Sequence, residues 1–313
     1  MKKLFALIIV ALTLAGCTVP QDEELKEPTS VDTSANAADA GSVSDETSGD
    51  TVDAVPDETS GNTVDAVSDA VDESVILDEA GIKITVKSLD KSAWLGPELK
   101  LLIENNTDKN LTVHVRNASV NGYMVSTSMS EDVAAGKKAN GAITFSNTSI
   151  GGAGISTFAD MEFSFHIIDE EWDTYLDTDM ITVRTAAAET YTYTYDDSGD
   201  EIYNNNGIRI VSKGLNNGDI FGKGAVFYFY NGSDQPVTIS DRDCSVNGFM
   251  LDPNLYVELM PGKHAVDDMD FWTSDLDENE IVDITDIEFS LHISNSDTWD
   301  TVDDSAPIVL HFD

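Results

Sequence analysis

Few residues in this sequence have a type and spacing that could carry out catalysis. The chain of 313 residues contains five histidines and two cysteines, Cys17 and Cys244. It contains no Gly-x-Ser-x-Gly and no His-Glu-x-x-His sequence, so these local motifs of α/β-hydrolases and zinc peptidases are absent. We therefore expect that the protein is not an enzyme and that only one of its cysteines is chemically modified.

Cys17 follows a short segment with the features of an export signal. Lys2 and Lys3 precede an apolar run from Leu4 to Leu14, which is shorter than the ~20 residues of a membrane-spanning helix. The sequence Leu14-Ala-Gly-Cys17 closely resembles the lipobox of bacterial lipoprotein precursors. The predicted segment 1–17 is then a lipoprotein signal peptide with its lipobox cysteine. The resemblance implies that the Cys17 thiol receives a diacylglyceryl group and that cleavage before Cys17 makes it the first mature residue. We expect a lipid-anchored protein on the extracytoplasmic face of the membrane; an ordinary secretory signal is the alternative.

Residues 18–74 have the composition of a disordered, acidic, low-complexity linker. They contain 16 acidic residues against one base, Lys26, and no aromatic residue. Such a segment buries too little apolar surface to offset the loss of chain entropy on folding. A stretch that begins at Asp45 is repeated from Asp57 with only two changes in twelve residues. We interpret the segment as a spacer, with a calcium-dependent or partner-binding tail as the alternative.

The rest of the chain consists of two copies of one module. A shift of 126 residues, as from Gly81 to Gly207, aligns most of the shared motifs, and one extra residue then aligns the last of them. The aligned pairs include Ser119-Val-Asn-Gly-Tyr-Met124 with Ser245-Val-Asn-Gly-Phe-Met250, Asp160-Met-Glu-Phe-Ser-Phe-His-Ile167 with Asp286-Ile-Glu-Phe-Ser-Leu-His-Ile293, and Trp172-Asp-Thr174 with Trp299-Asp-Thr301. We predict modules at residues 75–185 and 201–313, separated by an inter-repeat segment at 186–200.

Each module has the pattern of an all-β domain. Apolar residues alternate with polar ones around Ile82–Val86 and Phe163–Ile167, which is typical of strands with one buried face. Asn121-Gly122 and Asn247-Gly248 predict tight hairpins, because a type I′ turn needs positive φ at both central residues. Short strands at this spacing favour an immunoglobulin-like β-sandwich, so the predicted fold is two tandem sandwiches.

The repeated motifs also carry a resemblance to a known family. Ser-Val-Asn-Gly-(Tyr/Phe)-Met, Gly-Lys, Asp-x-Glu-Phe-Ser-x-His-Ile and Trp-Asp-Thr resemble an uncharacterised domain common in lipoproteins and surface proteins of Firmicutes. The resemblance covers both modules. It implies an immunoglobulin-like fold and an extracytoplasmic location, and it supplies no catalytic residue.

Aromatic residues are the candidates for recognition. Trp94 and Trp272 each lack a tryptophan counterpart in the other module, which favours a role in binding. Tyr191, Tyr193 and Tyr195 alternate along the inter-repeat segment, either as part of an edge strand with packed rings or as a platform that stacks on sugars. Trp172 and Trp299 recur in both modules, and we expect them to have a structural role at the end of each sandwich.

Metal sites are poorly supported by the sequence. Glu162 and His166 lie four residues apart on a predicted strand, which separates them by about 13 Å. Asp275-Leu-Asp-Glu-Asn-Glu280 resembles the start of an EF-hand loop but has Glu280 where the loop needs glycine. We expect no metal and no cofactor, with calcium as the alternative. Cys244 aligns with Ala118, so we expect its thiol to fill a small core site.

Charge limits the possible partners. The chain carries 58 acidic and 17 basic side chains, a formal net charge of −41, which excludes binding to nucleic-acid phosphates. We expect a non-enzymatic surface protein that is anchored in the membrane by lipid and presents its modules for binding or spacing at the cell envelope. Its partner would be an envelope protein or a glycan. The alternative is a carbohydrate-binding or calcium-dependent adhesion module of a surface system.

Overall fold

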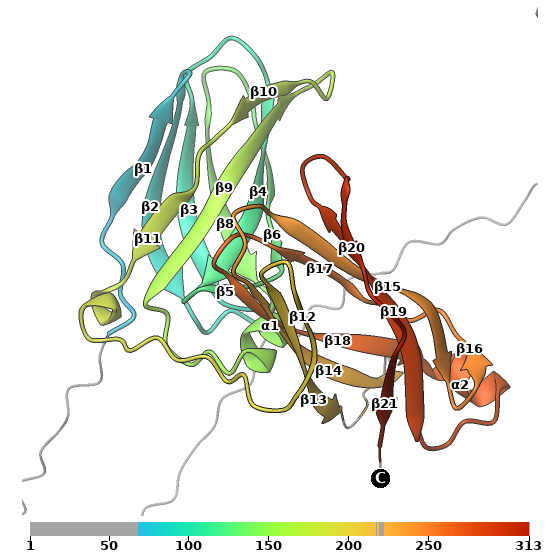
Figure 1. Cartoon of the computed structure of the whole chain (residues 1–313). Coiled ribbons are helices and arrows are strands. Elements are labelled where there is room, and N and C mark those ends of the chain that lie inside the picture. Colours follow the sequence, from blue (N-terminus) through green and yellow to red (C-terminus); the bar gives the residue numbers. More distant parts are fainter. Residues whose placement is uncertain (1–67, 217, 219–221, 313) are drawn as a thin grey trace, which may run out of the picture. The chain divides into compact units, whose positions relative to one another are not determined.

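A computed structural model describes residues 68–216, 218 and 222–312 (Figure 1). Cys17 and nearly all of the predicted linker lie outside these residues. The described chain is almost entirely β-structure, arranged as sandwich-like pairs of sheets, which confirms the predicted all-β tandem sandwich fold. Within the described residues, no helix is long and apolar enough to cross a membrane.

The first module contains eleven strands and one short α-helix, followed by a short 3-10 helix. They are β1 (Ser74–Glu79), β2 (Ile82–Asp90), β3 (Glu98–Asn105), β4 (Leu111–Val120), β5 (Tyr123–Met124), β6 (Thr127–Ser128), β7 (Ser130–Val133), β8 (Lys138–Phe145), α1 (Asn147–Gly152), β9 (Asp160–Asp169), β10 (Thr174–Asp177), β11 (Ile181–Arg184) and η1 (Ala186–Glu189).

The second module repeats this order, without a counterpart of β6 among its described strands. Its elements are β12 (Asp200–Asn205), β13 (Ile208–Leu215), β14 (Gly222–Asn231), β15 (Val237–Val246), β16 (Phe249–Met250), β17 (Tyr256–Leu259), β18 (His264–Trp272), α2 (Thr273–Glu278), β19 (Asp286–Asn295), β20 (Thr301–Asp304) and β21 (Ile308–His311).

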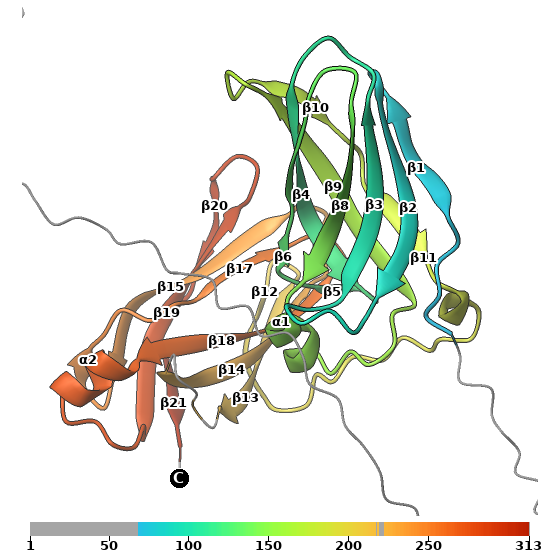
Figure 2. The ribbon, with the colours of Figure 1, turned by 180° about the vertical axis from the view of Figure 1, so that it is seen from behind.

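Both modules have the same sheet topology. In the first module β1, β2, β3 and β8 pair antiparallel in that order, and the opposing sheet is built on the β4–β9 pair (Figures 1 and 2). In the second module β12, β13, β14 and β18 form the first sheet, and β15 pairs with β19 in the other. The dense apolar runs of β3 and β14 lie between two neighbouring strands each, as their composition predicts.

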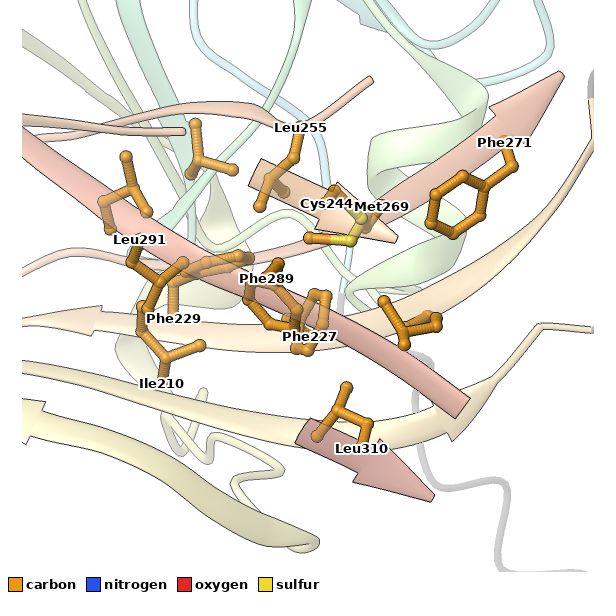
Figure 3. Close-up of a cluster of buried hydrophobic side chains, with 14 of the residues drawn as sticks. Ile210, Phe227, Phe229, Cys244, Leu255, Met269, Phe271, Phe289, Leu291 and Leu310 are labelled. Carbon is orange, nitrogen blue, oxygen red and sulfur yellow. The ribbon is translucent and has the colours of Figure 1, made fainter. Parts of the chain in front are cut away.

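The core of each sandwich consists of the inward positions of these strands. Ile82, Ile84, Phe163 and Phe165 are buried in the first module, which confirms the predicted alternation. Figure 3 shows the corresponding core of the second module, where Phe227, Phe229 and Phe289 pack together. Each fully buried side chain of this size stabilises the fold by roughly 1.5–3 kcal/mol relative to exposure.

The two Asn-Gly turns have the predicted conformation. Asn121 and Gly122 have φ of 51° and 83°, and Asn247 and Gly248 have φ of 50° and 82°. The side-chain amide of Asn121 also binds the start of β9. Its Oδ1 accepts a hydrogen bond from the Asp160 backbone N–H, and its Nδ2 donates to the Thr157 carbonyl. Asn247 makes the same bonds in the second module. Each turn is therefore bound to the neighbouring strand of its own sheet, β9 in the first module and β19 in the second.

The two modules belong to one compact unit and meet at the first of these turns. The backbone N–H of His264 donates to the Gly122 carbonyl at 3.0 Å, and His264 pairs with Tyr123 as a short parallel bridge between β18 and β5. Lys263 forms an ion pair with Glu162 at 2.8 Å. We call this contact the junction.

Aromatic rings complete the junction. His264 stacks on Tyr230 at 4.7 Å between centroids, and its Nδ1 shares a hydrogen bond of 2.6 Å with the Tyr228 hydroxyl. Burial, followed by the charge of Lys263, lowers the pKa of His264 to about 4. The imidazole is therefore neutral near pH 7.

The structure differs from the sequence predictions at one module boundary and in the conformation of the inter-repeat segment. Val71 packs against the first core, and Lys91 forms an ion pair with Asp69, so the first module includes residues before position 74. The inter-repeat segment is not an edge strand: η1 ends at Glu189, and β12 begins only at Asp200. Its contacts are made by side chains rather than by a ladder of backbone hydrogen bonds.

Candidate recognition corners

All four tryptophans have exposed side chains. Trp94 is 90% exposed and Trp272 is 54% exposed. Trp172 and Trp299 lie in the turns after β9 and β19, at the end of each sandwich as predicted. Because both of these side chains are also exposed, they do not stabilise the sandwich by packing.

Trp94 and Trp272 occupy the same corner of their modules, although the sequence alignment does not pair them. Trp94 lies in the loop before β3, and its carbonyl accepts a hydrogen bond of 3.4 Å from Nδ2 of Asn147, the first residue of α1. Trp272 is the residue immediately before α2 and pairs with Gly222 at the start of β14. In each module the tryptophan thus stands where the loop before the third strand meets the short helix.

A lysine accompanies the tryptophan at each corner. Lys91 Nζ donates to the Ser156 carbonyl at 2.7 Å, and Lys223 Nζ donates to the Val282 carbonyl at 3.2 Å. Ser156 and Val282 are equivalent under the shift of 126 residues, whereas the two lysines are not. Sequence reasoning missed both lysines, because neither is part of a repeated motif.

We define the first corner as Lys91, Trp94, Leu95 and Ser156, and the second corner as Lys223, Trp272 and Val282. Leu95 and Val282 are exposed apolar neighbours of the tryptophans in these loops. A pocket of about 460 Å³ beside the second corner is lined in part by Lys223, Leu276 and Val282. An exposed indole face next to an exposed aliphatic group suits a ligand that has an apolar face, while the lysines, paired with Asp69 and Asp283, hold the loops of the corners.

The three tyrosines of the inter-repeat segment do not form a flat platform. Tyr191 and Tyr193 meet edge to face, with 5.0 Å between ring centroids. The Tyr193 hydroxyl donates to Asp160, and desolvation together with this carboxylate raises the pKa of Tyr193 to about 12. Tyr195 stacks on His264 in the junction. These contacts hold the segment against both modules, so the sugar-stacking interpretation is not supported.

The repeated histidines have carboxylate partners in both modules. His166 Nδ1 lies 2.5 Å from Asp177 Oδ1, and His292 Nδ1 lies 2.6 Å from Asp304 Oδ1. Both pairs join neighbouring strands of one sheet. Within residues 68–216, 218 and 222–312, no three His, Cys, Asp or Glu residues gather as a metal site.

The acidic stretch that resembled an EF-hand has another conformation. Residues Asp275–Glu278 belong to α2, so the stretch does not form the extended loop in which alternate residues bind calcium. Glu280 adopts a φ of 56° without the glycine that such a loop requires. This arrangement gives calcium no recognisable loop at the position that the sequence indicated.

Cys244 is buried in the second core beside Met269, as predicted (Figure 3). Burial, with a smaller contribution from the Asp241 and Asp252 charges, raises the pKa of its thiol to about 12. It is the only cysteine in the described part of the chain. A neutral, buried thiol of this kind fills space and is a poor nucleophile.

Comparisons with known proteins find weak structural similarity only. No protein-family model and no curated protein matches the sequence. The YadV chaperone covers 74% of this chain over 100% of its own length, at 11% identity and a TM-score of 0.23.

Two further solved structures have a similar degree of likeness. A Salmonella enterica SafA pilin in complex with the SafB chaperone covers 69% of this chain and 89% of its own, at 12% identity and a TM-score of 0.20. The Amycolatopsis orientalis exo-chitosanase CsxA covers 72% of this chain with 26% of its own, at 14% identity and a TM-score of 0.23. Similarity at this level assigns neither a family nor an activity to the chain.

Proposed function

We propose that this protein is a non-enzymatic binding protein, held by lipid at the extracytoplasmic face of the membrane, whose two Trp corners bind a component of the cell envelope. The observation that carries the proposal is the recurrence of one constellation at one place. Each module presents an exposed tryptophan and a lysine that binds the same loop carbonyl, yet Trp94 and Lys91 do not align with Trp272 and Lys223.

Duplication alone does not account for this recurrence. Residues inherited from a common module occupy aligned positions, as the exposed Trp172 and Trp299 nearly do. The corner residues instead come from the loop before β3 in one module and from the ends of β14 and β18 in the other. Two unrelated sets of side chains at one corner favour a requirement of the corner itself, namely an exposed indole in a loop that a lysine holds in place.

The proposed location rests on the N-terminal sequence. The basic start, the short apolar run and the Leu14-Ala-Gly-Cys17 lipobox support attachment through Cys17, and the acidic linker supports display away from the bilayer. Cells that express Cys17→Ser should release the protein or retain it as an unprocessed precursor. A Cys17→Ser protein that still fractionates as a processed, lipid-anchored form would contradict this part of the proposal.

Binding at the corners is tested by matched tryptophan variants. Trp94→Ala and Trp272→Ala should each weaken binding of the purified protein to isolated cell envelopes, and the double variant should weaken it further. Trp172→Ala and Trp299→Ala are the controls, because they remove exposed indoles from the opposite ends of the same modules. Equal binding by all four variants and the unchanged protein would overturn the assignment of the corners.

Carbohydrate recognition is the second candidate function, and the exposed indole faces favour it. Sugar rings stack on aromatic faces, and Trp94 is almost fully accessible for such a contact. A polysaccharide array and protease-treated envelopes separate the two candidates. Binding that survives proteolysis and appears on the array identifies a glycan, whereas loss of binding after proteolysis identifies a protein partner.

A further inference from the structure

The Asn-Gly hairpin is covered in one module and open in the other. Tyr123, which follows the first turn, is 5% exposed because the second module and Tyr195 lie over it. At the equivalent positions of the second turn, Phe249 is 47% exposed and Met250 is 69% exposed. A Cβ at Gly122 would lie 2.5 Å from the Tyr195 hydroxyl oxygen, whereas one at Gly248 would meet no atom within 4 Å.

The surface that covers the first hairpin is the turn before β18. In this turn the Lys263 N–H donates to the Met260 carbonyl at 3.1 Å, and Gly262 has a φ of 71°. The next residue, His264, then offers its backbone N–H to Gly122, while the Lys263 side chain reaches Glu162. The covering surface therefore consists of one turn, one strand end and one ammonium group.

The first module has the same surface, and it is exposed. The turn before β8 is closed by the Lys137 N–H to the Ala134 carbonyl at 3.0 Å, and Gly136 has a φ of 67°. Lys137 and Lys138, the counterparts of Lys263 and His264, have exposed side chains. Among the described residues, β6 pairs with β8 only at Thr144 and Phe145, so the β8 edge at Lys138 is unpaired on that side.

We propose that the open hairpin, Asn247–Met250, binds the Lys137–Lys138 edge of a second copy of this chain. The contact repeats between chains the junction that the two modules make within one chain. Lys137 of one copy forms an ion pair with Glu288 of the other. Glu288 lies opposite Ser245 on the β15–β19 pair, which is the position that Glu162 has opposite Ser119 on the β4–β9 pair. Phe249 and Met250 become covered in this contact, as Tyr123 is in the junction.

Charge favours this occupant over two others. The acidic N-terminal segment of the same chain is repelled by Asp283, Asp286 and Glu288, which the Asn247 hydrogen bonds and the β15–β19 pairing place near the open hairpin. A symmetric contact of two open hairpins would bring the same carboxylates together. Lys137 and Lys138 place two cations on this edge in a chain with a net charge of −41. Lys138 pairs with Glu104 of its own chain, so Lys137 is the cation that meets the carboxylates of the open hairpin.

The proposed contact is weaker than the junction and does not close on itself. The first module has Leu102 and Glu104 where the second has Tyr228 and Tyr230, so the ring stack on His264 has no equivalent there. A contact between different surfaces of identical chains continues from copy to copy unless its rotation closes a ring. Short chains of copies at high local concentration are the expected assembly.

Site-directed cross-linking tests this arrangement. Full-length chains carrying Cys17→Ser, solubilised in a mild detergent, receive either Lys137→Cys or Glu288→Cys and are treated with a short bismaleimide. A mixture of the two should give several-fold more cross-linked dimer than either variant alone, and the yield should rise with protein concentration. The internal control is one chain with both Glu162→Cys and Lys263→Cys, which should cross-link within itself.

Surface variants complete the test. Phe249→Ser with Met250→Ser should lower the mixed cross-link several-fold, with no change in melting temperature, because both side chains are exposed. Trp94→Ser, which removes an exposed side chain elsewhere, should leave the yield unchanged. An equal or greater yield from Glu288→Cys alone, or a mixed yield no higher than the Cys17→Ser background, would overturn the proposal. Neither result bears on envelope binding by the Trp corners.

Discussion

The imidazole of His264 stacks on the phenol ring of Tyr195 with 3.5 Å between ring centroids and 17° between ring planes. The two residues come from β18 and from the segment that joins the modules, so the stack ties this segment to the second module. The Tyr195 hydroxyl also donates to the Asn121 carbonyl at 3.3 Å, in the first module. A single neutral histidine thus lies at the centre of all three parts of the junction.

Stability should fall on acidification as His264 becomes protonated in the unfolded chain. The pKa of His264 is about 4 in the folded protein, against about 6.5 when unfolded. Between these values the unfolded state binds more protons, so stability is lost as pH falls from 6.5 to 4, by at most about 3 kcal/mol. Urea unfolding at several pH values measures this dependence.

The His264→Phe variant isolates the contribution of the imidazole. It retains a stacking ring and removes the titration, so its stability should depend less on pH between 6.5 and 4 than that of the unchanged protein. The pKa of Asp241, raised to about 6 by burial, gives a dependence of opposite sign that both proteins share. Identical pH profiles for the two proteins would show that His264 is not neutral in the junction.

Gly122→Ala and Gly248→Ala form a matched pair for the junction. Both glycines have φ near +82°, so each alanine introduces about 1–2 kcal/mol of backbone strain. Only the Gly122 variant also pushes a Cβ against the Tyr195 hydroxyl. Chemical denaturation should therefore show a larger loss for Gly122→Ala, and limited proteolysis should cut its inter-repeat segment faster. Equal losses would mean that Tyr195 does not cover the first turn.

Cys244 should be inert in the folded protein. Its thiol is buried and has a pKa of about 12, so iodoacetamide at pH 8 should label it only after denaturation. Cys244→Ala, which restores the residue of the first module, should cost about 1 kcal/mol of stability. Cys244→Ser should cost more, because a buried hydroxyl without a partner costs about 1–3 kcal/mol. Rapid labelling of the native protein would contradict this picture.

Calcium should leave the thermal stability of the protein unchanged. The stretch Asp275–Glu280 is largely helical and provides no loop that could surround an ion. Melting curves with millimolar calcium and with chelator should therefore coincide. An increase of several degrees that chelator reverses would reveal a calcium site and would favour the adhesion alternative.

Local patterns were sufficient to predict the fold. The 126-residue shift equates β4 with β15 and β9 with β19, and period-two alternation identifies their buried faces. The Asn-Gly pairs predict their own turns, because positive φ is a local preference. The extent of the first module was not visible in this way, because Val71 is a lone apolar residue in acidic sequence and only tertiary packing reveals its role.

The site could be predicted only in part. Trp94 and Trp272 were candidates because neither aligns with a tryptophan in the other module. Their common corner was not predicted, because it depends on the meeting of a loop and a helix that are distant in sequence. Lys91 and Lys223 bind equivalent carbonyls from different strand ends, which no alignment of the repeats reveals. The tyrosine spacing was misleading, since alternation predicts a strand whereas aromatic contacts fix an irregular segment.

One strand connects the junction to the second corner. β18 begins at His264, ends at Trp272 and pairs with β14 over this whole length, from Tyr230 to Gly222. A displacement of Trp272 relative to the junction would therefore have to stretch β18 or shift its register against β14, so the two ends of this strand are rigidly coupled.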